Sequence, residues 1–345
     1  MSRLLLFSSF LLVLAGGVRT VAAQALPGDD ETPAAAAGQG HLNVLTPTLG
    51  GKQLWTDELV FRDWRIQRHA YTGHCRLLDN ENHRRAWGTF EQCRDALEKF
   101  KVKLLLPPLG GKVVIALHGI IRTRASMAGM CEFLERDGGY TALNVSYAST
   151  RSDLNSHAAA LGLVVGNLGP GVTEINFVAH SLGNLVIRRY LADCYQQRNG
   201  LTVDSRLHRI VMLAPPNSGA HLAEIFKNNV VVDMVWGQSA RQLAEGWDQL
   251  RNELAVPGCQ FGILAGGIGT PEGRNRWLQG DDDLVVSVEE TKLPGARDFA
   301  VLPVIHGWIM DEPLARKYTL MFLQHGHFVS EAQRHPLGPE TPKSP

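Results

Sequence analysis

A serine, a run of three aspartates and a histidine are the residues of this chain whose types and order could support nucleophilic chemistry. Ser181 lies in the sequence A-H-S-L-G, the aspartates occupy residues 281–283, and His306 follows them. A serine hydroxyl is a poor nucleophile until a histidine takes its proton and a carboxylate fixes the tautomer of that histidine. The chain therefore holds the groups that such chemistry needs, in the order serine, acid, histidine.

The surroundings of Ser181 predict a strand, a sharp turn and a helix. Residues 175–179 form an apolar run, and residues 182–195 carry apolar side chains at helical spacing. In a nucleophile elbow the serine sits on a strained turn, and small flanking residues let strand and helix approach. Ala179 and Gly183 are the small residues here. The alternative for this motif taken alone is an ordinary Ser–Gly turn.

The acid and the base are expected on loops beyond later strands. Three adjacent carboxylates at 281–283 repel one another, which is unusual for a purely structural loop, although a solvated acidic turn is the alternative. His306 ends the apolar run 300–305, where a base must sit to reach the serine. His325 and His327 come at the end of the last helical pattern and are expected to be helix C-terminal cations. His180 is expected to be a packing residue.

Two backbone N–H groups are predicted to stabilise a tetrahedral oxyanion. In elbow geometry one belongs to the residue after the serine, which is Leu182. The second comes from the loop after the first central strand, where Gly119 lets the backbone turn so that the N–H of Ile120 faces the site. His118 precedes that glycine. A histidine in such a position, considered alone, is more often an ordinary loop residue.

Alternating strand and helix patterns predict an α/β fold with a mostly parallel central sheet flanked by helices. Residues 113–117 form a continuous apolar run, which is typical of a strand buried on both faces. Residues 222–254 interrupt the alternation and are either an ordinary crossover or a lid over the site. The other expected strands are 140–147, 175–179, 208–214, 261–265 and 299–302, and the expected helices are 123–136, 153–165, 182–195 and 308–324.

Composition and the N-terminus bound the class and the compartment. The chain has 345 residues, 44% of them hydrophobic, and Lys plus Arg equals Asp plus Glu at 34 each, so no global charge indicates a nucleic-acid partner. Residues 1–25 have the basic, apolar and small-residue order of a signal peptide, which predicts export to the periplasm or the medium. An uncleaved membrane anchor is the alternative. Residues 26–41, rich in Ala, Pro, Gly and acids, predict a flexible linker.

Residues 42–109 predict a folded N-terminal extension whose fold and role the sequence does not reveal. Aromatic residues are frequent there, and residues 88–103 have the pattern of a helix. Of the five cysteines, Cys75 and Cys93 are the pair whose bridge would close a loop of roughly twenty residues. His69, His74, Cys75, His83 and Cys93 suggest a metal site, but their spacing fits no common zinc pattern, and we expect none.

Five stretches together carry a resemblance to a known family. They are LHGIIRTRASM (117–127), VAHSLGNLVIRRYL (178–191), VMLAPPNSGAHLA (211–223), QGDDDLVVSVEETKLPG (279–295) and LPVIHGWIM (302–310). From about residue 110 to 330 the chain resembles the α/β-hydrolase superfamily, and within it the bacterial secreted lipases and esterases. Residues 331–345 are a C-terminal tail.

The resemblance implies a Ser-His-Asp ester hydrolase that needs no cofactor and no metal. It implies Ser181 as nucleophile, His306 as base, and the N–H groups of Ile120 and Leu182 as oxyanion donors. For the acid it selects Asp283, with Asp282 the runner-up. The implied substrate is a small ester or a lipid, with transient contact at a lipid surface. A thioesterase or acyltransferase with the same triad, and a non-catalytic binding module, are the alternatives; acyl-chain length, alcohol and oligomeric state stay open.

Overall fold

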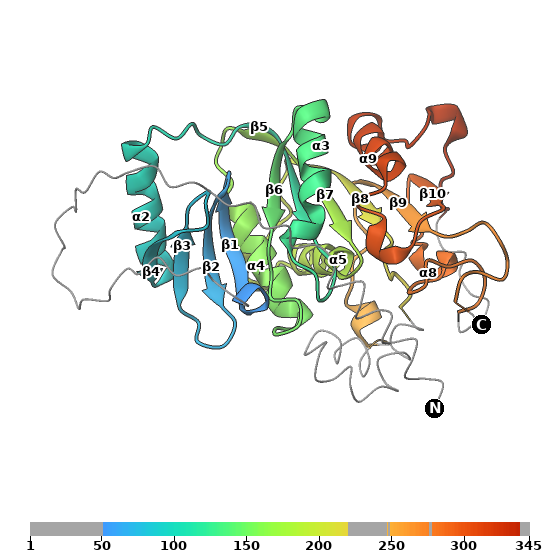
Figure 1. Cartoon of the computed structure of the whole chain (residues 1–345), viewed down its shortest axis with the longest axis horizontal. Helices are drawn as coiled ribbons and strands as arrows, with labels where there is room; N and C mark the ends of the chain where they lie inside the picture. Colours follow the sequence, from blue (N-terminus) through green and yellow to red (C-terminus); the bar gives the residue numbers. More distant parts are fainter. Residues whose placement is uncertain (1–50, 220–246, 248, 276–277, 339–345) are drawn as a thin grey trace, which may run out of the picture. The chain divides into compact units, whose positions relative to one another are not determined.

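A parallel six-stranded sheet forms the centre of the computed structural model, which describes residues 51–219, 247, 249–275 and 278–338 (Figure 1). Its strand order is β10-β9-β8-β7-β5-β6, and all neighbouring pairs run parallel. The strands are β5 (Gly111–Leu117), β6 (Thr141–Val145), β7 (Val172–His180), β8 (Leu207–Leu213), β9 (Gln260–Gly266) and β10 (Asp298–Leu302). The predicted α/β class with a mostly parallel sheet is confirmed.

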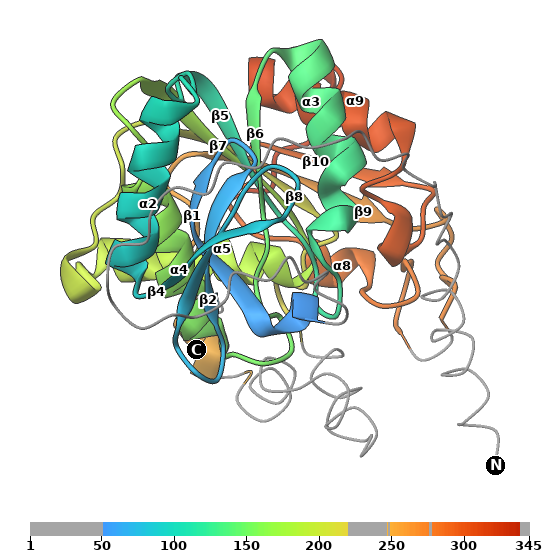
Figure 2. The same ribbon diagram turned by 60° about the vertical axis from the view of Figure 1, so that its left-hand side comes forward.

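Helices cover both faces of this sheet because alternate side chains of each strand point to opposite faces. Val113, Ile115 and Leu117 of β5 belong to the core that contains α4 (Leu154–Gly166) and α5 (Leu182–Tyr195). Val114 and Ala116 instead join the core under α3 (Ala128–Gly138) and α9 (Pro313–His325). Figures 1 and 2 show α3 and α9 side by side on that second face. A strand buried on both faces reads as an uninterrupted apolar run, which is why the sequence revealed it.

Two of the predicted helices begin differently from the sequence pattern. The segment expected to be helical from 123 starts as the 3₁₀ turn η2 (Arg124–Met127) before α3. The last helix, expected from 308, starts only at Pro313, with Glu312 as its N-cap and the 3₁₀ turn η4 (His306–Trp308) before it. Proline has no N–H and is favoured in the first helical turn, so it marks the start of α9.

The described part of the N-terminal extension is an antiparallel sheet with one helix. Its strands, in the order β1-β2-β3-β4, are β1 (Trp55–Phe61), β2 (Trp64–His69), β3 (Cys75–Leu78) and β4 (Arg84–Gly88). The predicted helix is α2 (Phe90–Lys103), which begins with a capping box formed by Thr89 and Gln92. Buried side chains of this sheet share one hydrophobic core with α4 and α5. The extension and the parallel sheet are therefore packed together.

A buried charge pair joins the two sheets. The Asp57 N–H of β1 donates to the Ser146 carbonyl just beyond β6, and the Ser146 N–H donates to the Asp57 carboxylate at 2.7 Å. The same carboxylate accepts from Arg65 at 2.9 Å and from Gln67 at 2.7 Å. Because breaking a buried pair leaves an uncompensated charge, this contact fixes where β1 meets β6.

The Cys75–Cys93 bridge considered from the sequence is not formed. Both residues are free thiols and fully buried. Burial raises the pKa of Cys75 to about 11 and that of Cys93 to about 12. Both therefore remain protonated at neutral pH and pack as small apolar side chains.

Several predictions fall on residues outside the described part of the chain. They are the signal peptide at 1–25, the linker at 26–41 and most of the crossover or lid at 222–254. The tail is described as far as residue 338, and Leu337 there exchanges backbone hydrogen bonds with Gly295 and Ala296. No helix within the described ranges is long and apolar enough to span a bilayer.

Candidate active site

Ser181 occupies a strained turn between β7 and α5. Its backbone angles are φ 51° and ψ −119°, a combination that residues other than glycine rarely adopt. The turn is held because the Ser181 N–H donates to the Leu213 carbonyl at 3.0 Å. A Cβ on Gly183 would lie 2.9 Å from the Leu117 side chain and 3.0 Å from the Leu117 and His118 carbonyls. The predicted need for a small residue at 183 is confirmed.

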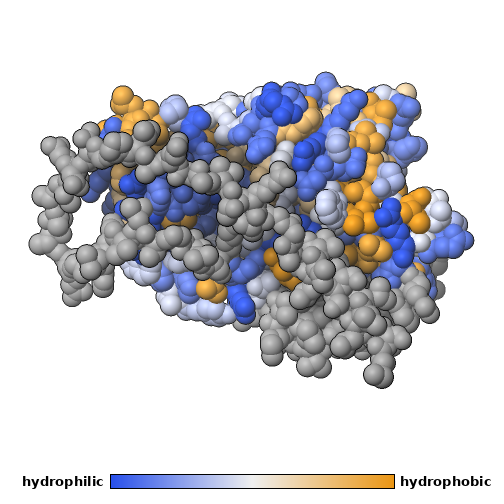
Figure 3. Space-filling model, in the orientation of Figure 1, coloured by the Kyte–Doolittle hydropathy of each residue, from blue (hydrophilic) through white to orange (hydrophobic). Residues whose placement is uncertain are grey.

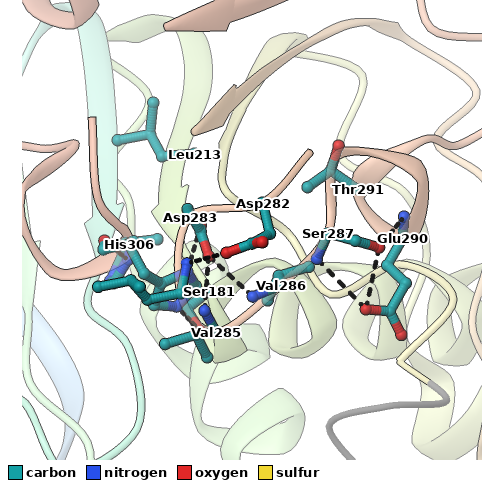
Figure 4. A network of polar contacts seen from close by, with 12 residues as sticks. Ser181, Leu213, Asp282, Asp283, Val285, Val286, Ser287, Glu290, Thr291 and His306 are labelled. Atoms are coloured by element: carbon teal, nitrogen blue, oxygen red, sulfur yellow. Dashed lines mark hydrogen bonds and ion pairs between the residues drawn. The ribbon is translucent and has the colours of Figure 1, made fainter. Parts of the chain in front are cut away.

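Three side chains from different loops form one hydrogen-bonded chain (Figure 4). The Oγ of Ser181 lies 2.9 Å from Nε2 of His306, which is in η4. The other ring nitrogen of His306, Nδ1, lies 2.7 Å from the Asp283 carboxylate. All three residues are buried. The order along the chain and the placement at strand ends define the α/β-hydrolase arrangement.

Each of the three adjacent aspartates has its own set of donors, so they do not form an acidic cluster in solvent. Asp281 accepts from two N–H groups at 268 and 269, and Asp282 from those at 274, 275 and 284. One carboxylate oxygen of Asp283 accepts from the N–H groups of 285 and 286, which leaves the other for His306. Asp283 is thus the aspartate hydrogen-bonded to His306, and Asp282 instead accepts backbone N–H groups of its own loop.

The predicted oxyanion donors are unused in the structure. Neither the Ile120 N–H nor the Leu182 N–H donates a hydrogen bond to any described residue. A Cβ on Gly119 would lie 2.8 Å from Nδ1 of His180 and 3.2 Å from Cβ of Ser181, so the loop approaches the serine closely. Two free N–H groups beside the serine are the arrangement that could bind a negatively charged oxygen.

His118 stabilises the turn at Gly119 through hydrogen bonds of its ring. Its Nδ1 lies 2.8 Å from the Gly119 carbonyl, and its Nε2 accepts from the Tyr147 N–H at 3.4 Å. That acceptor role assigns the proton to Nδ1 and makes the ring neutral. Burial lowers the pKa of His118 to about 4, which agrees with a neutral ring. The residue is a structural support of the turn.

Three positioning residues were not found by sequence reasoning. Gln53 donates to the Ile121 carbonyl at 3.0 Å and to the Arg122 carbonyl at 2.7 Å. The N-terminal extension therefore holds the loop of residues 118–122, which carries the predicted oxyanion donor and is called the oxyanion loop below. His180, expected only to pack, has its Nε2 2.9 Å from the His306 carbonyl. Asn184 donates to the carbonyls of Ser181 and Leu213. The available signal for Asn184 is a polar residue in the first turn of a helix that begins directly after Ser181.

Of the three histidines considered for a metal site, two make ring contacts, and His83 lies 3.3 Å from the Glu81 carboxylate. His69 and His74 stack with centroids 5.2 Å apart, and His74 stacks on Trp87 at 3.8 Å. Among the residues that the structure describes, no three His, Cys, Asp or Glu side chains come close enough to hold a metal ion. His325 is in the last turn of α9, as predicted, whereas His327 lies beyond the end of the helix and stacks with His325.

Comparisons with known proteins give matches among solved structures only. No protein-family model and no curated protein sequence matches the chain. Among solved structures, the lipase BlEst2 of Bacillus licheniformis is similar with a TM-score of 0.44 and 16% identity, over 64% of this chain and 94% of that one. The metagenomic carboxyl esterase MGS0156 is similar with a TM-score of 0.41 and 18% identity, over 58% of this chain and 67% of that one. An esterase of Thermogutta terrifontis is similar with a TM-score of 0.40 and 14% identity, over 64% of this chain and 92% of that one.

Proposed function

We propose that this protein is a carboxylic-ester hydrolase that acts through an acyl-enzyme on Ser181. The observation that carries the proposal is the chain of hydrogen bonds from Ser181 through His306 to Asp283, at 2.9 Å and 2.7 Å. Because Nδ1 of His306 donates its proton to the Asp283 carboxylate, the unprotonated Nε2 faces the serine hydroxyl and can take its proton. No metal or organic cofactor is needed for this reaction.

The reaction has two halves that use the same residues. In the first, Ser181 attacks the ester carbonyl while His306 takes its proton, and the developing oxyanion accepts from the N–H groups of Ile120 and Leu182. His306 then protonates the leaving alcohol. In the second half, His306 activates a water that attacks the acyl-enzyme, and Ser181 regains its proton.

An apolar surface near His306 supports a substrate with an apolar acyl group. Figure 3 shows hydrophobic residues gathered over α9 and the segment before it. Trp308, two residues after His306, is 53% exposed, and Leu314 at the start of α9 is also exposed. Exposed apolar side chains that gather beside a site are typical of ligand or lipid contact. This surface favours an ester or lipid substrate, with lipid contact on this face.

Hydrolysis of p-nitrophenyl butyrate and p-nitrophenyl palmitate by the wild-type protein tests the proposal. The Ser181→Ala variant should lose at least about 10³-fold in kcat, and a fluorophosphonate probe should label wild type but not this variant. Ser330→Ala, at a serine between α9 and η5, is the matched control and should behave as wild type. If wild type cleaves neither ester and takes no label, or if Ser181→Ala retains activity, the proposal fails. The ratio of the two rates separates esterase from lipase.

A further inference from the structure

Arg122 is a partly buried cation next to the candidate site, two residues beyond the oxyanion donor Ile120. Among the described residues, its side chain makes no ion pair and no hydrogen bond. Several other arginines of the described residues have acceptors: Arg188 donates to the carbonyls of 255 and 217, and Arg206 binds Asp204 at 2.7 Å. Arg84, which is also partly buried, instead has its guanidinium over the ring of Trp87. Arg122 is therefore a partly buried cation whose guanidinium N–H groups remain available to a ligand.

The backbone holds Arg122 in one place. Its N–H donates to the Gly119 carbonyl at 3.3 Å, and its carbonyl accepts from Gln53 at 2.7 Å. Ile121, between the two oxyanion-loop residues, has φ 63°, an unusual value for a β-branched residue. A loop fixed by these contacts at such a backbone angle presents the Arg122 side chain in a defined direction.

That direction is toward the catalytic histidine. A side chain at Gly307 would collide with Nη2 of Arg122, so the guanidinium fills the space beside this glycine. Gly307 directly follows His306 in η4. Arg122 therefore lies beside the residue that follows His306, within reach of a group on a substrate bound at this histidine.

The electrostatics of this position favour an anion. Burial lowers the pKa of Arg122, because the charged guanidinium has lost water without gaining an acceptor. The nearby Asp311 carboxylate opposes this effect, but Asp311 is half exposed and binds Arg316 at 2.9 Å. A planar guanidinium with free N–H groups matches a phosphate or carboxylate with two parallel hydrogen bonds.

We propose that Arg122 binds an anionic group, a phosphate or a carboxylate, on the alcohol portion of the ester substrate. This inference rests on the proposed ester hydrolysis and adds to it the chemical class of the alcohol. Arg122 acts as a binding residue, and the bonds broken and formed are those already described for Ser181.

The test compares matched esters of butyric acid in pH-stat assays. The pairs are 1-butyrylglycerol against 1-butyrylglycerol 3-phosphate, and ethyl butyrate against O-butyryl-lactate, so that phosphate and carboxylate are scored separately. Wild type should show a higher kcat/KM for the anionic member of at least one pair. Arg122→Gln should lower the anionic-to-neutral ratio by roughly 10- to 100-fold. Arg122→Lys, which keeps the charge but not the fork, should lie between.

Arg124→Gln is the control, because the Arg124 guanidinium binds Asn82 of the N-terminal sheet at 3.0 Å, away from His306. It should leave the ratio unchanged. If wild type cleaves neutral esters but shows no preference for either anionic one, or if Arg122→Gln keeps the wild-type ratio, the inference on Arg122 is wrong while the ester hydrolase stands. If wild type cleaves none of the four esters, the proposed function fails and the inference fails with it. Thermal melting of each variant confirms that the folded protein was compared.

Discussion

Substituting the neighbouring aspartates 282 and 283 separately should have opposite consequences for activity and stability. Both side chains are fully buried, and they are adjacent in sequence, so they form a matched pair. Asp283→Asn places an amide where one carboxylate oxygen accepts from the N–H groups of 285 and 286, at 3.0 and 2.8 Å. The amide carbonyl must face those donors, which turns its NH₂ toward His306.

An NH₂ group facing Nδ1 of His306 forces that nitrogen to accept, and the proton moves to Nε2. Nε2 then donates to Ser181 and cannot take its proton. The expected loss in kcat is about 10⁴-fold, equivalent to about 5.5 kcal/mol in the barrier, since each factor of ten corresponds to about 1.4 kcal/mol. The fold should be little affected, because the replacement is isosteric and keeps the two loop hydrogen bonds.

Asp282→Asn should instead cost stability. Both oxygens of Asp282 accept backbone N–H groups, with Arg274 and Asn275 on Oδ2 and Leu284 on Oδ1. An amide keeps only one acceptor, so at least one buried donor loses its partner at a cost of about 1–3 kcal/mol. We expect a melting temperature lower by several degrees and a kcat within about tenfold of wild type.

The assay is kcat on p-nitrophenyl butyrate per mole of folded protein, with thermal melting of each variant to establish the folded fraction. The reasoning is refuted if Asp282→Asn loses about 10³-fold or more in kcat while Asp283→Asn stays within tenfold. It is also refuted if both variants keep wild-type kcat.

Three further predictions concern the support of the site. Asn184→Ala removes donors from the Ser181 and Leu213 carbonyls and should lower stability by about 1–3 kcal/mol, measured by urea unfolding; an unchanged midpoint contradicts the assigned role. Gly119→Ala should reduce kcat at least roughly tenfold, because its methyl group would press on Ser181, and kinetics equal to wild type would show that the loop has room. Stability should fall as the pH drops from about 6.5 toward about 3, because burial lowers the pKa of His157 to about 3, so the unfolded chain binds a proton in this range and the folded chain does not. His157→Gln should make the slope of unfolding free energy against pH less steep by up to roughly 1.4 kcal/mol per pH unit, and an equal slope would exclude the residue as a source.

The central sheet and its helices could be predicted from the sequence because their burial has a simple period. The strand β5 lies between two helical layers and is apolar from residue 113 to 117, and α5 begins directly after Ser181 as its spacing indicates. The strand β1 could not be predicted in this way. Its Asp57 and Glu58 are buried against Arg65 and Arg68, so charged residues occupy positions that a hydrophobic pattern assigns to solvent.

The candidate site was readable only as far as residue types and order allow. Three identical carboxylates in a row leave the choice among them to the resemblance, because the direction of each side chain depends on which backbone N–H groups the loop presents. The contributions of Gln53 and His180 depend on contacts with residues 68 and 126 positions away, respectively, and no local pattern encodes such distances. They become visible only when the chain is folded.

Four of the nine non-glycine residues with positive φ in the described part of the chain lie on loops of this sheet edge. Ile121, Ser181, Ala214 and Leu284 all have positive φ, and each lies beyond the C-terminal end of a strand of the parallel sheet. A non-glycine residue in this region costs about 1–2 kcal/mol, and none of the four is an asparagine or aspartate, which tolerate it best. In each case the surrounding contacts hold the angle, as the Leu213 carbonyl does for Ser181 and Gln53 does for Ile121. Because glycine would relax the backbone at each of these positions, the side chains present keep about 1–2 kcal/mol of strain each at the sheet edge where Ser181 and His306 meet, and such strain is typical of functional sites.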